Sequence, residues 1–332
     1  MTPPVQPETQ ARDRLVREWR PRGLLDGLAR LALSAPLGVA LVALSGIGHR
    51  WLDLLAQFTA PTLVATAALT ALLALTRLKL AALHGLVACI ALFMAVLPQW
   101  FPGGPAAEAG APVVRLYSAN LWARNRDVEA ITASIRDADA DIVVLIELGD
   151  GPAGRLDEVL AGYPHRVATP RIERPSGPAR SVIASRYPLV AIEDRPDGLH
   201  AVGASVRTPA GPVHVLGVHL TRPWPFQEQW GQIEQTLAIG AIRTDLTGPT
   251  IVAGDFNSVS SARVGRLLQA ETGLRPAPGF PGTWPSALPA AAAVTIDQVY
   301  ASPDLALARR RLGRPNGSDH RPVVVEFTRA AA

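Results

Sequence analysis

The pattern of hydrophobic and polar positions divides the chain into an apolar first third and a mixed remainder. Three runs in the first third contain no Asp, Glu, Lys or Arg: residues 31–48, 54–76 and 80–101. Because about 20 helical residues cross the hydrocarbon core of a bilayer, each run is long enough to span it. A signal peptide at 31–48 is the alternative, but two further runs follow and no small-residue cleavage site is evident. We therefore predict three transmembrane helices within residues 31–101.

From residue 113 onward the pattern changes to short apolar strands that alternate with turns and helices. The predicted strands are 113–118, 142–146, 181–185, 201–207, 213–218, 250–253, 296–300 and 323–327. An amphipathic helix is predicted at 127–137 and a further helix at 226–244, and the charge run at 309–311 is interpreted as a solvated face. The sequence thus predicts an α/β chain in four parts: a basic N-terminus (1–30), three transmembrane helices (31–101), a short linker (102–112) and one two-sheet domain (113–332).

Charge is distributed as unevenly as hydropathy. The mean hydropathy is +0.18 and the predicted pI is 9.8, yet residues 1–110 contain nine of the 32 basic and six of the 28 acidic residues. The remaining residues carry a charge of only about +1, whereas proteins that grip a nucleic-acid backbone usually have a basic surface. This argues against nucleic acid as a partner. Cys89 is the sole cysteine, so no disulfide forms within the chain.

Basic residues also predict the orientation in the membrane, because cytoplasmic loops are enriched in Lys and Arg. Eight lie on one predicted side: Arg12, Arg14, Arg17, Arg20, Arg22, Arg30, Arg77 and Lys79. Only Arg50 and Arg115 lie close to the membrane on the other side. We expect a multi-pass protein of the plasma membrane, with a cytoplasmic N-terminus and an extracytoplasmic C-terminal domain.

Polar side chains follow the predicted strands at the points where these strands end. They are Asn120, Glu147, His219, Gly254-Asp255-Phe256-Asn257, Asp297 and Ser318-Asp319-His320. Taken singly, each has a structural explanation: Glu147 as a strand-end cap, Asp255 as a turn former, His219 as an edge residue. Together they predict carboxylates, amides and imidazoles at one sheet edge, which is typical of a divalent-cation site with acid–base groups beside it.

This ordered set resembles the endonuclease/exonuclease/phosphatase superfamily, which includes DNase I-like nucleases, neutral sphingomyelinases and inositol-polyphosphate 5-phosphatases. The segment GDFN at 254–257, followed by SDH at 318–320, is the most specific part, and residues 179–188 resemble the family's usual ILSRYP strand. The resemblance covers about residues 111–328. It implies a DNase I-like four-layer α/β sandwich and hydrolysis of phosphoric esters without a covalent intermediate.

Roles for the site residues come partly from chemistry and partly from this resemblance. Glu147 is the expected main metal ligand, with Asn120 and Asp319 beside it, and oxygen ligands without cysteine favour Mg²⁺ or Mn²⁺. The resemblance implies catalytic roles for five residues: Asp255 orients or deprotonates water, Asn257 holds the phosphoryl oxygen or the nucleophile, His320 contacts the phosphoryl group, Asp297 fixes His320, and His219 assists the transition state or leaving group.

Two further features bear on the substrate. Arg222 is either a clamp for a second phosphate or an ordinary surface arginine. Trp224, Phe226, Trp230 and Trp284 are either an apolar approach for a lipid chain or core residues, and core packing is the preferred interpretation.

The architecture also resembles membrane-bound actinomycete members of the superfamily that are associated with teicoplanin-type glycopeptide resistance. That resemblance implies a lipid-linked phosphate of the cell wall, such as undecaprenyl pyrophosphate, as substrate. Phospholipid diesters and extracellular DNA are the alternative substrates. A non-catalytic membrane protein that binds a lipid or drug is the alternative of another class.

Overall fold

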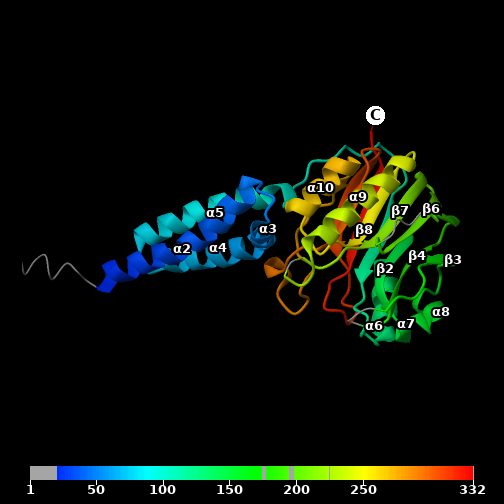
Figure 1. Cartoon of the computed structure of the whole chain (residues 1–332), viewed down its shortest axis with the longest axis horizontal. Coiled ribbons are helices and arrows are strands. Elements are labelled where there is room, and N and C mark those ends of the chain that lie inside the picture. The colour runs from blue at the N-terminus through cyan, green and yellow to red at the C-terminus, as the bar shows by residue number, and fades with distance from the viewer. Residues whose placement is uncertain (1–20, 174–176, 194–197, 224, 332) are drawn as a thin grey trace, which may run out of the picture.

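The computed structural model describes residues 21–173, 177–193, 198–223 and 225–331. Its first part is a bundle of long apolar helices that extends away from a larger α/β part (Figure 1). The helices are α2 (Pro21–Ser45), α3 (Arg50–Ala56), α4 (Thr59–Leu75) and α5 (Lys79–Trp100). Arg12, Arg14, Arg17, Arg20 and Trp224 lie outside the described residues.

The bundle agrees with the predicted membrane region only in part. Among the described residues, Gly23–Ser45 and Lys79–Trp100 are each long and apolar enough to cross a membrane. The first helix begins ten residues before the predicted run at 31–48 and ends before Gly46. It includes Asp26, which forms an ion pair with Arg30 (3.2 Å) and accepts a hydrogen bond from the backbone N–H of Ala81 (3.0 Å).

The predicted span at 54–76 is not one straight helix, because the chain bends by 54° between α3 and α4. Helix α3 packs against the α/β part through buried polar groups. The carboxylate of Asp53 accepts hydrogen bonds from Gln229 Nε2 and from the backbone N–H of Arg263, both at 2.7 Å. Gln57 Oε1 accepts a hydrogen bond from the backbone N–H of Val259 (3.2 Å). Helices α3 and α4 together count as a third candidate span, so α2–α5, called the anchor below, contain two candidate spans or up to three among the described residues.

The described residues of the α/β part form two six-stranded sheets. In spatial order, the first consists of β11 (Leu305–Leu312), β12 (Val323–Arg329), β1 (Val114–Asn120), β2 (Ile142–Gly149), β4 (Ala179–Ser185) and β3 (His165–Ala168). The second consists of β5 (Leu189–Ala191), β6 (Ala201–Thr208), β7 (Gly211–His219), β8 (Thr250–Asp255), β10 (Asp297–Ala301) and β9 (Arg275–Pro276). Strands β1 and β2 are parallel, as are β7 and β8, and the other pairs are antiparallel.

Helices cover both outer faces, which gives the predicted four layers. A core of aliphatic residues such as Val144, Val215 and Val325 lies between the two sheets. Helices α6 (Val128–Ala138), α7 (Asp150–Ala153) and α8 (Leu156–Val159) lie on the side of the first sheet. Helices α9 (Gln229–Asp245) and α10 (Arg263–Thr272) cover the second sheet, as Figure 1 shows. Each outer core therefore arises from the buried side of an amphipathic helix.

Most predicted elements are present with ends shifted by a few residues, but helix α10, strand β11 and several short elements were not predicted. Strands β3, β5 and β9 and helices α7 and α8 are two to four residues long, too short for a clear hydrophobic period. The charge run at 309–311 belongs to edge strand β11, where Arg309 is exposed and Arg310 is partly buried.

The predicted linker at 102–112 is partly ordered against the last strand. The backbone N–H of Glu108 donates to the carbonyl of Arg329 (2.9 Å), and Ala107 forms a β-bridge with Ala330. At the end of α5, the ring of Trp100 packs against that of Phe280, with 4.9 Å between the ring centroids. The anchor and the α/β part therefore contact each other at α3, at α5 and along the linker.

Candidate functional site

Six of the predicted polar residues converge at one end of the two sheets. Asn120 ends β1, Glu147 lies near the end of β2, His219 ends β7 and Asp255 ends β8. Asp297 begins the antiparallel strand β10, and His320 precedes β12. The sheet topology thus brings together groups that are up to 200 positions apart in the sequence.

Asp255 is at the centre of this cluster and is almost fully buried. Its Oδ2 accepts a hydrogen bond from Asn120 Nδ2 (2.9 Å), and its Oδ1 accepts one from the backbone N–H of Asn257 (2.8 Å). Gly254 before it has φ +144°, and a Cβ there would lie 2.0 Å from the carbonyl oxygen of Val218. Only glycine allows this close approach of β7 and β8, which places Asp255 beside His219.

Glu147 adopts a conformation that is rare for a residue with a side chain. Its φ is +54°, and the β2–β4 pairing shifts register between Leu145 and Leu148, as in a β-bulge. Its Oε1 lies 3.5 Å from His219 Nε2, and its Oε2 accepts a hydrogen bond from the backbone N–H of Ala123 (3.2 Å). A bulge re-aims a side chain, and strained backbone of this kind is concentrated at functional sites.

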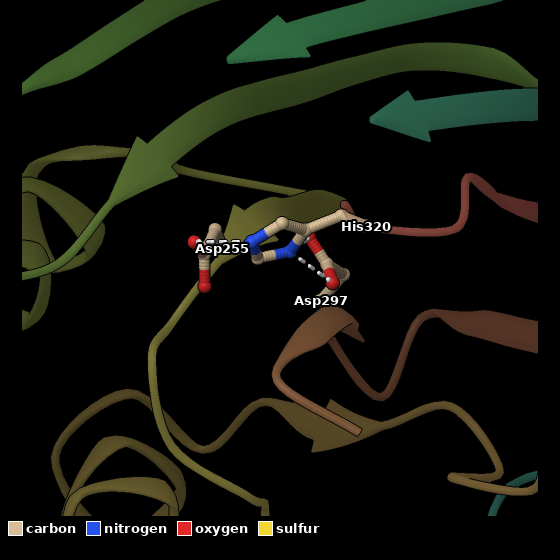
Figure 2. Close-up of side chains that lie close together, drawn as sticks. All are labelled: Asp255, Asp297 and His320. Atoms are coloured by element: carbon tan, nitrogen blue, oxygen red, sulfur yellow. Dashed lines mark hydrogen bonds and ion pairs between the residues drawn. The ribbon is translucent and has the colours of Figure 1, made fainter. Parts of the chain in front are cut away.

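Asp297 and His320 form a buried pair, drawn with Asp255 in Figure 2. His320 Nδ1 lies 2.9 Å from Asp297 Oδ2, while its Nε2 lies 4.0 Å from Asp255 Oδ2. Burial lowers the pKa of His320, but the carboxylates of Asp297 and Asp255 outweigh it and raise that pKa to about 10. Burial raises the pKa of Asp255 to about 7. The imidazole thus favours its charged form, and Asp255 titrates near neutrality.

Asp255, Asp297 and His320 form a candidate metal site, because their ligand atoms lie within 4.8 Å of one another. A donor set of carboxylates and imidazole suits a divalent cation. This set differs from the predicted ligands. The Nδ2 of Asn120 donates a hydrogen bond to Asp255, and its Oδ1 accepts a hydrogen bond from the backbone N–H of Trp122 (2.9 Å). Asp319 is exposed and accepts a hydrogen bond from Trp284 Nε1 (3.4 Å). Metal ligation by Glu147, Asn120 and Asp319 remains a prediction.

A cavity of about 470 Å³ opens over this cluster. The polar residues that line it are Asn120, Glu147, His219, Asp255, Asn257, Asp319 and His320. It is also lined by Leu54, Gln57 and Phe58 of the anchor. These three residues were not predicted as part of the site, because they lie within an apolar run that also fits an uninterrupted span.

A second cavity of about 650 Å³ adjoins the first, and most of the residues that line it are polar or charged. Arg124, His200 and Gln227 line it together with Glu147 and His219. Arg222 borders both cavities, which brings it to the site without settling the role predicted for it. The core-packing interpretation is wrong for Phe226 and Trp230, whose side chains are 72% and 61% exposed. Phe226 also lines both cavities.

Several solved structures share the fold of the α/β part. An endonuclease/exonuclease/phosphatase from Beutenbergia cavernae DSM 12333 matches with a TM-score of 0.52 and 22% identity, over 66% of this chain and 72% of that one. A family protein from Bacteroides thetaiotaomicron matches with a TM-score of 0.52 and 16% identity, over 65% and 98%. A mannosyl-6-phosphatase from Bacteroides thetaiotaomicron VPI-5482 matches with a TM-score of 0.53 and 16% identity, over 65% and 99%.

At these identities the structures establish the fold alone, a DNase I-like sandwich with two sheets. No curated protein sequence matches the chain. The sequence of residues 117–320, which contains every residue of the buried cluster, matches the endonuclease/exonuclease/phosphatase family. Since this match covers more than half of the 332 residues, the chain belongs to the endonuclease/exonuclease/phosphatase family.

Proposed function

We propose that this protein is a membrane-anchored, divalent-metal-dependent phosphoesterase that acts on a lipid-linked phosphate such as undecaprenyl pyrophosphate. The observation that carries the proposal is the composition of the 470 Å³ cavity. Its walls include the buried Asp/His cluster and also the α3–α4 region of the membrane anchor. A site between a catalytic cluster and candidate membrane helices favours substrates whose head groups lie at the bilayer surface, where their effective concentration is high.

The proposed reaction is attack of water on phosphorus, with cleavage of the bond to the leaving oxygen. Asp255, whose pKa is raised to about 7 by burial, accepts the proton of the attacking water. His320, held by Asp297 and protonated at neutral pH, neutralises charge on the phosphoryl oxygens. His219 lies 3.6 Å from Asp255 and 3.5 Å from Glu147, and it assists the departing oxygen. Asn120 and Asn257 hold the Asp255 carboxylate in place.

A bound Mg²⁺ or Mn²⁺ would neutralise part of the phosphate charge, which the cationic side chains of the site neutralise only in part. The carboxylate of Glu147, which lines the cavity beside His219, would be the main donor, because Asp255 acts as the base and a protonated His320 has no free lone pair for a metal. Arg222 lines both cavities, and in this proposal its guanidinium would bind the second phosphate of a pyrophosphate.

Basic residues of the anchor support an extracytoplasmic site. Arg77 and Lys79 lie at the turn between α4 and α5, close to the start of α2, at the end of the bundle away from the α/β part. Arg50 begins α3, at the opposite end of the bundle. With the basic end in the cytoplasm, the active site faces the outer leaflet, where hydrolysis of a cell-wall lipid phosphate would affect glycopeptide sensitivity.

Two other substrates and one other class of function remain as alternatives. A phospholipid diester would also reach the site from the bilayer. Extracellular DNA is disfavoured by the near-neutral charge of residues 111–332. A non-catalytic lipid- or drug-binding protein is disfavoured by the buried Asp255, Asp297 and His320, since burial of carboxylates has a desolvation cost that binding alone does not require.

The full chain in detergent with Mg²⁺ should release phosphate from undecaprenyl pyrophosphate much faster than it hydrolyses a phospholipid or nicks plasmid DNA at physiological salt. Its expression in a sensitive bacterium should raise teicoplanin tolerance. Asp255→Ala should abolish both effects, while Asp304→Ala, at an exposed position outside the site, should keep them. Comparable cleavage of plasmid DNA would replace the proposal with a nuclease. Tolerance retained by Asp255→Ala would replace it with the binding protein.

A further inference from the structure

The bend between α3 and α4 places part of the membrane anchor in the wall of the catalytic cavity. We call Leu54, Gln57 and Phe58 the anchor corner. All three line the 470 Å³ cavity that also contains Asp255 and His320. Figure 1 shows α3 at the end of the bundle that adjoins the α/β part. The corner therefore lies where the candidate membrane helices and the catalytic cluster meet.

The corner is held in place by hydrogen bonds to residues far away in the sequence. Asp53, one residue before the corner, bonds to Gln229 and to the backbone of Arg263 at the start of α10. Gln57 Oε1 accepts from the backbone of Val259. These buried contacts hold α3 against the α/β part, so the corner forms part of the cavity wall.

The side chains of the corner offer two different kinds of contact. Phe58 is 43% exposed and Leu54 is partly buried, which leaves apolar surface open to a ligand. Gln57 is only 4% exposed, and its Nε2 has no hydrogen-bond partner among the described residues. A buried donor without an acceptor is costly. An acceptor on a molecule in the cavity would remove this cost.

The wall of the cavity combines apolar and polar residues. Phe226 and Pro223 add apolar surface to that of the corner, whereas Glu147, His219 and Arg222 are polar or charged. One cavity thus offers both charged and apolar contacts, which fits an amphiphile with a phosphorylated head and a hydrocarbon chain.

We infer that the anchor corner is part of the substrate-binding site and determines specificity for the lipid chain. Leu54 and Phe58 contact the hydrocarbon chain beyond its first four carbons, and Gln57 Nε2 donates a hydrogen bond to an oxygen of the head group. The occupant is the chain of the substrate and not a protein segment, because the corner continues directly into α4, half of a candidate membrane span. This inference rests on the proposed lipid-linked substrate.

Binding of non-hydrolysable phosphonates tests the inference independently of catalysis. The full chain in detergent with Mg²⁺ would be titrated calorimetrically with butylphosphonate and dodecylphosphonate. Phe58→Ala and Leu54→Ala should each lower the affinity for dodecylphosphonate by about tenfold, while butylphosphonate binds as before. Loss of the apolar area that one such side chain buries against the long chain has an effect of about this size. Phe93→Ala is the matched control, because Phe93 in α5 is 41% exposed and does not line the cavity.

Gln57→Met, which removes the donor, should weaken both phosphonates by a similar factor because it acts at the head group. Equal effects of Phe58→Ala and Phe93→Ala, or no binding of either phosphonate to the wild-type chain, would overturn the inference. Unchanged affinities of both phosphonates for Gln57→Met would overturn the hydrogen bond that we assign to Gln57. The proposed function fails separately: dodecylphosphonate would bind through the corner, but undecaprenyl pyrophosphate would not be hydrolysed.

Discussion

Asp53 of the membrane anchor accepts a 2.7 Å hydrogen bond from Gln229, a residue 176 positions later at the start of α9. The same carboxylate accepts a hydrogen bond from the backbone N–H of Arg263 at the start of α10. One buried side chain thus joins the anchor to both helices that cover the second sheet. This contact is one of several that hold the anchor beside the active site, together with those at Gln57, at Trp100 and along the linker.

We predict that Asp53→Ala destabilises the protein and impairs the site. The change leaves the buried donors of Gln229 and Arg263 without their acceptor, which should lower the free energy of unfolding by about 2–4 kcal/mol. Thermal unfolding of the full chain in detergent measures the loss. Asp304→Ala, at an exposed position, is the control. An unchanged unfolding temperature in Asp53→Ala would mean that the anchor is held mainly by other contacts.

A second prediction concerns the metal. EDTA should abolish phosphate release, and Mg²⁺ or Mn²⁺ should restore it. Glu147→Gln keeps the shape of the side chain but removes its charge, so the metal concentration for half-maximal activity should rise and the rate should fall by about 100-fold or more. Glu158→Gln, in the exposed ion pair with Arg155, should behave as wild type. Full activity in EDTA would exclude the metal-dependent reaction.

The Asp297–His320 pair predicts a change in pH dependence. The two carboxylates raise the pKa of His320 to about 10, so the active protonated form persists below that pH and is lost as the pH rises through it. Asp297→Asn removes one of the negative charges. The alkaline limb of the pH–rate profile should therefore move to lower pH, and the maximal rate should fall by about 10- to 100-fold. An unmoved limb in the variant would show that Asp297 does not control this proton.

The orientation of the catalytic domain is tested by fusions to the C-terminus. If the basic end of the bundle is cytoplasmic, three crossings place residues after α5 outside the cell. Alkaline phosphatase fused after Ala332 should then be active, and green fluorescent protein should be dark. A fusion after Thr76, in the turn between α4 and α5, should give the opposite pattern. Reversal of both results would place the site in the cytoplasm.

The sequence alone was sufficient to predict the family, the layers of the α/β part and the residues of the cluster. The reason is physical: Asn120, Glu147, His219 and Asp255 all follow apolar strands, and strands of a sandwich that end at the same edge bring such residues together. The motif at 254–257 is also constrained locally, because only glycine fits between β7 and β8 before Asp255.

Tertiary structure decided how the anchor contributes to the site. In the sequence, Leu54 to Thr76 reads as one uncharged span, because hydropathy measures composition and not direction. The bend after α3 is stabilised by acceptors and donors about 200 positions away, on Gln229, Val259 and Arg263. No local pattern records such partners. The position of Phe58 beside the catalytic cluster, and the exposure of Phe226 and Trp230, therefore became visible only in the folded chain.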